Sequence, residues 1–330
     1  MARYKVSVSY IGKNYVGWQR QKNGVSIQEV IEHSLSKVVK QPINIVATGR
    51  TDSGVNAKGQ IFHFDSELTM TNDKWKMAIN NFLPDDIFVN NVELVDDIFH
   101  SRYCALYKIY EYNINLGEYD VFTKDSAYQC YYKLDLEKME EASKIFIGYH
   151  DFTSFCSNPI DKFPNQKREI FNIDFIFNKD VLKIVFKGKG FLRYMVRMIV
   201  ATLIEVGRGK LSIVDVEKML EARSKDVVRR NAKPNGLTLV YIKHFDLVYM
   251  DESVIIRSLH EEDKRLLKHF ENYDYLVDQI KDNVYAMCYK NSEEIIAVLN
   301  DYECISKDNL EENIVLTSKM IDSIKKHKKK

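Results

Sequence analysis

The first 65 residues alternate between two periods of hydrophobic positions. Val6, Val8 and Tyr10 recur at every second position, which is the period of a half-buried strand. After residue 25 the apolar residues change to helical spacing, and Ser26 stands three residues before Glu29, as in a capping box. The two-residue period then returns twice. The pattern predicts strands at 5–11, 43–47 and 60–64 and a helix at 26–38.

The chain up to residue 245 repeats this order of strands and helices. Alternating apolar positions predict strands at 99–115, 173–177, 182–186 and 236–245, and helical spacing predicts helices at 135–147, 191–206 and 214–220. Strands mixed with helices in two similar halves indicate an α+β fold, with a mixed or antiparallel sheet packed against helices in each half. We expect the first half at 1–120 and the second at 121–248, with 120–133 as the crossing segment.

Residues 249–330 form an extension without a recognisable motif. Helical spacing at 261–280 and at 309–324 surrounds two expected short strands within 283–299, which favours a small folded C-terminal appendage over a disordered tail. The closing KKHKKK is typical of a frayed, solvated chain end.

Composition narrows the class of protein. The chain has 330 residues, of which 45% are hydrophobic and 29% charged, as in ordinary globular proteins of two or three domains. No apolar run is long enough to span a bilayer and no signal-type apolar block precedes the first strand, so we expect a cytoplasmic protein without membrane partners. Five cysteines form no CxxC pair and are odd in number, which argues against a zinc ribbon and a disulfide framework.

The net charge of +1 is the sum of two segments of opposite charge. Residues 251–330 contain 13 Lys and Arg against 17 Asp and Glu, which leaves 35 against 30 in residues 1–250. An acidic extension therefore masks a mildly basic body. This composition permits RNA binding without requiring it.

The segment "GRTDSGVNAKGQIFHF" (49–64) places Asp52 on a loop at the end of a predicted strand. Its three glycines allow tight turns and the close approach of a large ligand, although an Asx turn explains an isolated Asp equally well. No second carboxylate or histidine stands at ligand spacing, so the loop does not indicate a metal site. "GRGK" (207–210) lacks the earlier glycine and the Ser or Thr after the lysine that a phosphate-binding loop requires.

Two further features carry candidate chemistry. Arg193 and Arg197 are four residues apart in the apolar helix predicted at 191–206, and therefore on one face, where a buried guanidinium needs a partner. Snorkelling to solvent, or an ion pair with a purely structural role, is the alternative for both arginines. Tyr110 and Tyr112 share one face of a predicted strand, where aromatic residues usually serve packing.

Taken in order, these features resemble the TruA family of tRNA pseudouridine synthases. The resemblance covers residues 3–245 and rests on these motifs: "GWQRQ" (17–21), "SIQEVIE" (26–32), "GRTDSGVNAKGQIFHF" (49–64), "NFLPDDI" (81–87), "FHSRY" with "YKIYEY" (99–112), "HDFTSF" (150–155), "GFLRYMVRMIV" (190–200) and "NGLTL" (235–239). It implies two related halves that form a central cleft, and the isomerisation of uridine to pseudouridine in the anticodon stem-loop of tRNA, at positions 38 to 40.

The resemblance also implies roles for individual residues. Asp52 matches the catalytic aspartate, Tyr110 the tyrosine against the target uracil, and Arg197 the arginine that pairs with the carboxylate. Arg50 matches the arginine that helps to displace the target base. The sequence departs from the family at Ser53, Asn56, Arg193, Tyr194 and Met198, all of which flank these positions.

The implied chemistry suits these residue types. The isomerisation breaks an N-glycosidic bond and forms a carbon–carbon bond with the same base, so it requires no cofactor. The carboxylate can act as a nucleophile or as a base, and an adjacent arginine is expected to lower its pKa by about 1–3 units. Stacking on Tyr110 contributes roughly 1–3 kcal/mol toward holding a displaced base. The basic residues expected to bind RNA are Arg20, Arg50, Lys58, Lys187, Lys189, Arg193, Arg208 and Lys210.

The partners follow from the same resemblance. We expect tRNA as the substrate and a homodimer as the assembly. A protein that binds tRNA on the same scaffold without catalysis, or acts as an RNA chaperone, is the alternative, against which stand the intact Asp52, Tyr110 and Arg197. A metal-dependent nuclease would require clustered carboxylates that the sequence lacks. Because the core ends near residue 245, we expect truncation after Met250 to leave an active enzyme.

Overall fold

The computed structural model describes residues 1–95, 97 and 99–244, and beyond them the backbone of five short strands. The chain divides into two compact units, one of residues 1–95 with 107–243 and one of residues 96–106 with 244–330. The five strands belong to the second unit: β11 (Ser253–Ile256), β12 (Tyr275–Lys281), β13 (Val284–Tyr289), β14 (Val298–Asn300) and β15 (Glu303–Ile305).

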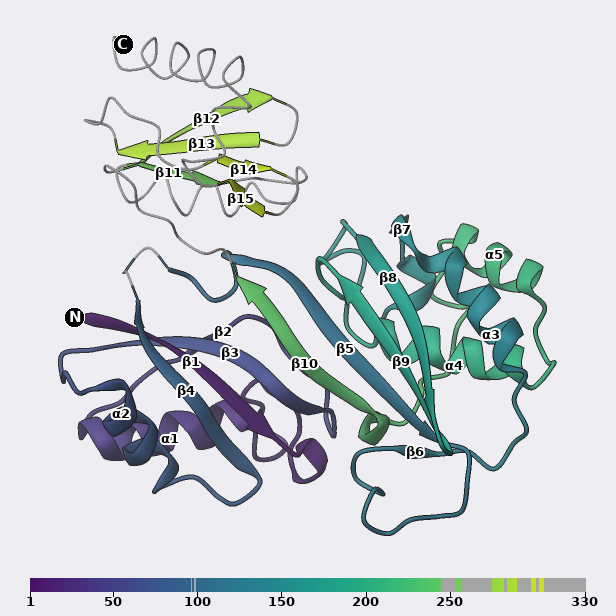
Figure 1. The fold of residues 1–330 in the computed structure, drawn as a ribbon, viewed down its shortest axis with the longest axis horizontal. Helices are drawn as coiled ribbons and strands as arrows, with labels where there is room; N and C mark the ends of the chain where they lie inside the picture. Colours follow the sequence, from purple (N-terminus) through teal and green to yellow (C-terminus); the bar gives the residue numbers. More distant parts are fainter. Residues whose placement is uncertain are drawn as a thin grey trace. The chain divides into compact units, whose positions relative to one another are not determined.

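A mixed ten-stranded sheet dominates the part of the chain before residue 245 (Figure 1). The strands follow the order β4-β1-β3-β10-β5-β9-β8-β7, with β2 on β3 and β6 on β5. Their bounds are β1 (Ala2–Tyr10), β2 (Val46–Ala47), β3 (Asn56–Ser66), β4 (Ile87–Val95), β5 (Ala105–Asn115), β6 (Tyr128–Gln129), β7 (Gly148–Asp151), β8 (Lys167–Asn178), β9 (Val181–Gly188) and β10 (Leu237–His244). The predicted α+β fold is confirmed.

The two halves share this sheet through their central strands. The pairs β1–β3, β1–β4, β5–β9 and β8–β9 are antiparallel. The parallel contact of β10 with β3, at Thr238–Asn56 and Leu239–Ala57, joins the end of the second half to the first. The closing strand of the core is therefore also the strand that fixes the halves side by side.

The described residues contain five helices, which pack on the sheet or on one another: α1 (Ile27–Val39), α2 (Asn72–Asn80), α3 (Leu136–Ser143), α4 (Met195–Gly207) and α5 (Ile213–Glu221). Local caps explain where several of them begin. The Ser26 hydroxyl accepts a hydrogen bond from the Glu29 amide at 3.3 Å, and Ser212 and Asp215 form a complete capping box at α5. None of the helices in these residues is long and apolar enough to cross a membrane.

Each half has its own apolar core. In the first half the rings of Tyr4, Phe64 and Trp75 meet at centroid distances of 5.1–5.3 Å and are almost fully buried. In the second, alternate residues of β9 are buried while their neighbours are partly exposed. The buried side of α4 supplies the matching apolar residues. These cores bury the face of the sheet on which Tyr110 and Tyr112 lie.

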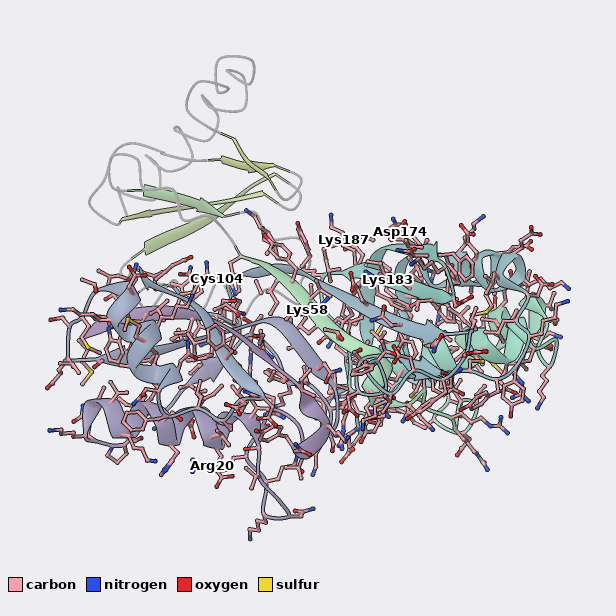
Figure 2. All side chains as sticks on the ribbon, turned by 60° about the horizontal axis from the view of Figure 1, so that its bottom comes forward. Arg20, Lys58, Cys104, Asp174, Lys183 and Lys187 are labelled. Carbon is pink, nitrogen blue, oxygen red and sulfur yellow. The ribbon has the colours of Figure 1, made fainter. Side chains whose placement is uncertain are left out.

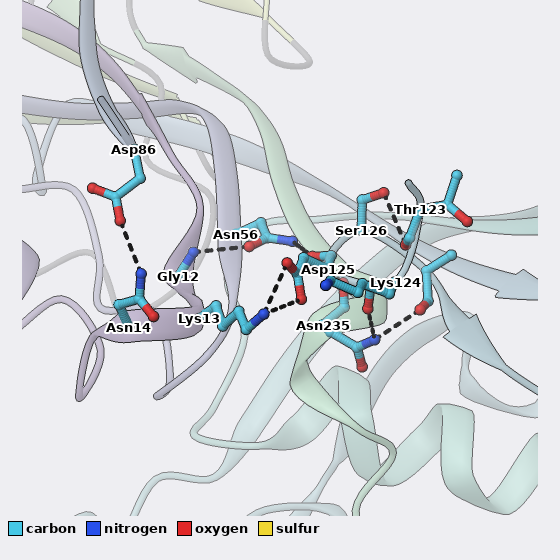
Figure 3. Close-up of polar contacts among 11 residues, drawn as sticks. Gly12, Lys13, Asn14, Asn56, Asp86, Thr123, Lys124, Asp125, Ser126 and Asn235 are labelled. Carbon is cyan, nitrogen blue, oxygen red and sulfur yellow. Dashed lines mark hydrogen bonds and ion pairs between the residues drawn. The ribbon is translucent and has the colours of Figure 1, made fainter. Parts of the chain in front are cut away.

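The crossing segment is tied to both halves (Figure 3). Asn56 donates from Nδ2 to the carbonyl of Asp125 at 2.8 Å, and Lys13 pairs with the Asp125 carboxylate at 3.0 Å. Asn235, directly before β10, donates to the carbonyls of Lys124 and Ala127 at 2.7 Å each. Three hydrogen bonds from two side-chain amides and one ion pair thus hold residues 124–127 against the segments that lead into β3 and β10.

Three predicted elements differ from the structure. The helix predicted at 191–206 begins only at Met195, because Tyr194 has a left-handed backbone with φ 65°. The strand predicted at 99–115 begins at Ala105, since residues 101–104 form a turn. The strand predicted at 43–47 is reduced to two residues.

The extension contains a further correction. Residues 275–280 were expected in a helix but belong to β12, which pairs antiparallel with β13. Tyr275, Leu276 and Val277 are types that suit a strand, and pairing with an adjacent strand overrides their helical spacing. The predicted strands within 283–299 correspond to β13 and the start of β14. The helix predicted at 309–324, and residues 261–274 of the other one, lie outside the described residues.

Candidate active site

The loop between β2 and β3 holds Asp52 in a fixed backbone. The Thr51 hydroxyl and the Tyr10 phenol share a buried hydrogen bond of 2.8 Å, and the Thr51 carbonyl accepts from the Trp18 amide at 3.1 Å. Ser53 donates from its hydroxyl to the Tyr15 carbonyl at 3.1 Å. Gly17, with φ 101°, passes so close that a Cβ there would lie 2.7 Å from the Thr51 oxygen. Only glycine fits at this crossing.

Arg197 reaches Asp52 from the first turn of α4. Its Nη1 lies 3.5 Å from Oδ2 of Asp52, and its Nε donates to the Ala232 carbonyl at 2.8 Å. The side chains of Arg197 and Asp52 are only 12% and 18% exposed. An arginine of the second half thus faces a carboxylate of the first, although 145 positions separate them in the sequence.

The electrostatic balance at Asp52 differs from the expectation. Burial raises the pKa of the Asp52 carboxyl, while the charges of Arg197 and then Arg193 and a hydrogen bond from Arg197 lower it; the net direction is upward. The expected lowering by the adjacent arginine is real but smaller than the desolvation, so the predicted net direction was wrong. The site therefore contains a carboxylate that is costly to ionise and two cations that reduce this cost.

Tyr110 lies beside this pair on β5. It is 9% exposed and its ring meets that of Phe191 edge-on, with the centroids 5.3 Å apart. Burial raises the pKa of the Tyr110 hydroxyl, and the nearby Tyr10 and Asp52 raise it further, so the phenol remains neutral at physiological pH. Tyr112, two residues along, donates to the Lys233 carbonyl at 2.9 Å and anchors the strand to the segment that also contacts Arg197.

Arg193 and Tyr194 precede α4 and do not belong to it, contrary to the prediction that Arg193 and Arg197 share a helical face. Arg193 is exposed, yet its charge acts on Asp52. Its guanidinium carbon lies 4.9 Å from the centroid of the Tyr194 ring, and that of Arg197 lies 5.1 Å from the same ring. The structure brings both arginines to Asp52 by a turn and not by helical periodicity.

The other basic residues expected to bind RNA divide into two groups. Arg50 is exposed two residues before Asp52, Lys58 is exposed on β3, and Lys187 lies over the Tyr107 ring at 4.4 Å. Lys189, half-buried, follows β9. Figure 2 shows Lys58 and Lys187 near the middle of the sheet, and Arg20 on the opposite side of the first half.

Arg20, Arg208 and Lys210 are each paired with a carboxylate other than Asp52. Arg20 pairs with the buried Glu32 at 2.8 Å. Arg208 and Lys210 pair with Glu205 at 2.7 and 3.9 Å, at the far end of α4. Eleven residues of helix at 1.5 Å each place Arg208 about 16 Å from Arg197 along the axis. The structure does not bring Arg208 and Lys210 to the candidate site, and Arg20 is engaged by Glu32.

The sequence interpretation missed three contributors to the site. Tyr10 and Gly17 fix the Asp52 loop, and Phe191 supports Tyr110. Tyr10 belongs to the buried face of the first predicted strand, and the other two stand inside the quoted motifs, but no spacing rule connects them with Asp52. Across the described residues, no group of three or more His, Cys, Asp or Glu side chains could hold a metal ion.

Comparisons with known proteins point in one direction. The family model described as tRNA pseudouridine synthase matches residues 6–104 and 142–244, which contain Asp52 and Arg197 respectively. The chain is 42% identical to tRNA pseudouridine synthase A of Bacillus licheniformis over 240 residues, which cover 72% of this chain and 97% of the relative. It is 43% identical to the protein of that name from an Exiguobacterium species over 239 residues (72% and 96%) and 38% identical to that of Staphylococcus aureus over 257 (78% and 94%).

Proposed function

The chain belongs to the tRNA pseudouridine synthase family, and we propose that it isomerises uridine to pseudouridine in the anticodon stem-loop of tRNA, with Asp52 as its catalytic carboxylate. One observation carries this assignment of the site. Asp52 is enclosed by Arg197 and Tyr110, two residues of the types that the chemistry requires, although all three come from distant parts of the sequence.

Asp52 is the residue that reacts. The reaction breaks the bond between N1 of uracil and C1′ of ribose, and forms a bond from C5 to C1′; the proton lost from C5 is balanced by one gained at N1. An ionised carboxylate can attack the sugar or the base, or remove a proton in an elimination route. In every route it must be anionic, and Arg197 and Arg193 favour that state against the desolvation of the site.

Tyr110 acts as a neutral aromatic residue. Its phenol is held protonated by burial and by the neighbouring Asp52, so its contribution comes from the ring and from a hydroxyl that can donate a hydrogen bond. Taking the target base out of its stack costs a few kcal/mol, and stacking on the ring offsets roughly 1–3 kcal/mol of this cost. We assign Arg50, exposed two residues before Asp52, to the displacement of the target base from its stack.

The substrate-binding surface and the assembly belong to the same proposal. We assign phosphate contacts to four basic residues: Lys58, Lys187, Lys189 and Arg193. We also assign the protein to the cytoplasm, where tRNA is found. We assign the protein a homodimeric assembly, as the resemblance to the family implies. Light scattering of the purified protein at micromolar concentration measures the assembly; a monomer there contradicts this part of the proposal.

The decisive experiment maps pseudouridine in tRNA. Cells lacking this protein should lose modification in the anticodon stem-loop, and the wild-type gene should restore it. The Asp52→Asn variant should bind tRNA with unchanged affinity and restore nothing. Restoration by this variant would show that the protein acts as an RNA-binding protein or chaperone, and loss of modification elsewhere in tRNA would correct the target.

A further inference from the structure

Tyr194 has a backbone conformation that its side chain disfavours. It stands at the N-cap of α4 with φ 65° and ψ 0°, in the left-handed region. Bulky residues rarely occupy this region, whereas asparagine tolerates it. The other described non-glycine residues with positive φ are Lys40, Lys179 and Arg223, none of which belongs to the candidate site. Backbone strain that persists beside reactive groups is commonly connected with their function.

The ring of Tyr194 contacts both cations of the site. The guanidinium carbons of Arg193 and Arg197 lie 4.9 and 5.1 Å from its centroid, within the range of cation–π attraction. Nη2 of Arg193 also lies 3.2 Å from the phenol oxygen and donates to it. One aromatic side chain thus holds the two guanidinium groups that oppose the desolvation of Asp52.

Hydrogen bonds fix the backbone around Tyr194 on both sides. The Arg193 amide donates to Oδ1 of Asn158 at 2.8 Å, and the Arg193 carbonyl accepts from Ser157 at 3.1 Å. The Tyr194 carbonyl accepts the first helical bond of α4, from Met198 at 2.9 Å. The left-handed turn between these anchors decides the direction in which the ring points.

We propose that Tyr194 is a positioning residue, which holds the guanidinium groups of Arg193 and Arg197 in the field of Asp52. This inference rests on the proposed function. The ring does not need to touch the reacting atoms: its effect passes through the two arginines. The strained turn persists because it directs an aromatic face, and not a smaller side chain, toward both cations.

The proposal separates stability from activity. An asparagine at position 194 relieves the backbone strain but leaves both guanidinium groups without the ring. The groups that face Asp52 are then the displaced Arg193 and Arg197 and the neutral Tyr110, which itself neighbours Tyr10. With less positive charge held nearby, the pKa of Asp52 should rise further, and the carboxylate should be lost at a higher pH.

The test compares Tyr194→Asn with two controls. Tyr194→Phe keeps the ring over both guanidinium groups and loses only the bond to the exposed Arg193. Lys179→Asn relieves the same kind of backbone strain, φ 53°, in the turn between β8 and β9. Three measurements are made on each variant: the pKa of the Asp52 carboxyl carbon by ¹³C NMR titration, the melting temperature, and kcat and KM across pH.

For Tyr194→Asn we expect an unchanged or higher melting temperature, a higher pKa of Asp52, and a kcat reduced about ten- to a hundredfold with KM nearly unchanged. The acidic limb of its pH profile should move upward. Tyr194→Phe and Lys179→Asn should keep the wild-type pKa of Asp52 and rates close to wild type.

Three results would overturn the inference: an unchanged pKa of Asp52 in Tyr194→Asn, an unchanged kcat, or a fall in kcat that merely follows a lower melting temperature. The NMR titration requires no turnover, so it decides the role of Tyr194 even if the wild-type protein proves inactive on tRNA. Inactivity of the wild type would instead contradict the proposed function.

Discussion

The two ends of α4 each present arginines to a carboxylate, and they differ in how closely the charges meet. At the first turn, Asp52 has Arg197 at 3.5 Å. At the last, Glu205 has Arg208 at 2.7 Å, Arg230 at 3.3 Å and Lys210 at 3.9 Å. The two carboxylates are almost equally buried, with 18% and 16% of the side chain exposed.

The difference distinguishes a reactive carboxylate from a structural one. Three cations enclose Glu205 and two of them belong to the same helix end, so this network closes the helix against its surroundings. Asp52 has a longer contact with its cation, which leaves its oxygens less fully occupied. Burial also raises the pKa of its carboxyl group. Equal burial therefore does not imply an equal role, and the distance to the nearest cation separates the two.

Removing the charge of Asp52 should have the largest effect on activity and should separate Asp52 from Glu205 most clearly. Asp52→Asn should reduce pseudouridine formation by at least about a thousandfold. The pKa of Asp52 is higher in the folded than in the unfolded state, so the protonated carboxyl favours the folded state. This contribution to stability is complete below the unfolded pKa and is lost as pH rises through the folded pKa. At pH 7 the amide should therefore raise the melting temperature. Glu205→Gln is the matched control and should do the opposite: retain activity and lower stability. Near-normal turnover by Asp52→Asn contradicts the mechanism.

Arg197→Leu should have the next largest effect. Loss of this guanidinium should lower kcat about a hundredfold and move the acidic limb of the pH profile upward, because its charge lowers the pKa of Asp52. The matched variant Arg208→Leu, at the other end of the helix, should leave the profile in place. A pH–rate series on both variants makes the measurement; equal profiles would mean that Arg197 serves only packing.

Tyr110→Phe should produce a smaller loss. The ring and its edge-on contact with Phe191 remain, and only the neutral hydroxyl is removed. We expect kcat to fall about tenfold, the value of one hydrogen bond of about 1–1.5 kcal/mol, with little change in KM. Single-turnover kinetics separate the two parameters. An unchanged rate would reduce Tyr110 to a stacking surface.

Affinity for tRNA should distinguish the basic residues at the two ends of α4. Each phosphate contact contributes about −0.7 to −0.9 to the slope of log affinity against log salt. Arg193→Ala should reduce the steepness by about one such contact, whereas Arg208→Ala should not, since Glu205 already engages its guanidinium. Filter binding at several salt concentrations tests both, and equal slopes for the two variants refute the distinction.

Truncation after Met250 should have the smallest effect. The matches to the relatives cover 72–78% of this chain but 94–97% of theirs, so the extension lies largely beyond what they share. We expect the shortened protein to remain folded and to modify tRNA at the wild-type rate. A truncated protein that is folded by circular dichroism but inactive on every tRNA would assign the extension to the active site.

The sequence determined the elements and the reactive residue types. The periods of two and 3.6 residues located most strands and helices of the core, and the ordered motifs identified Asp52, Tyr110 and Arg197 as candidates. These features are local, because the alternation of apolar residues or a capping serine is visible within a few residues of sequence. The same local rule failed at residues 275–280, where pairing with a neighbouring strand decided the conformation.

Only the tertiary structure decided how these residues act on one another. The turn at Tyr194 places Arg193 before the helix, and burial raises the pKa of Asp52 although a lowering was expected. Glu205 forms ion pairs with Arg208 and Lys210. Each outcome depends on distance and desolvation between groups far apart in the chain. Periodicity carries no information about either quantity, because the energy of a charge depends on what surrounds it in space, and β10 fixes those surroundings by joining the two halves.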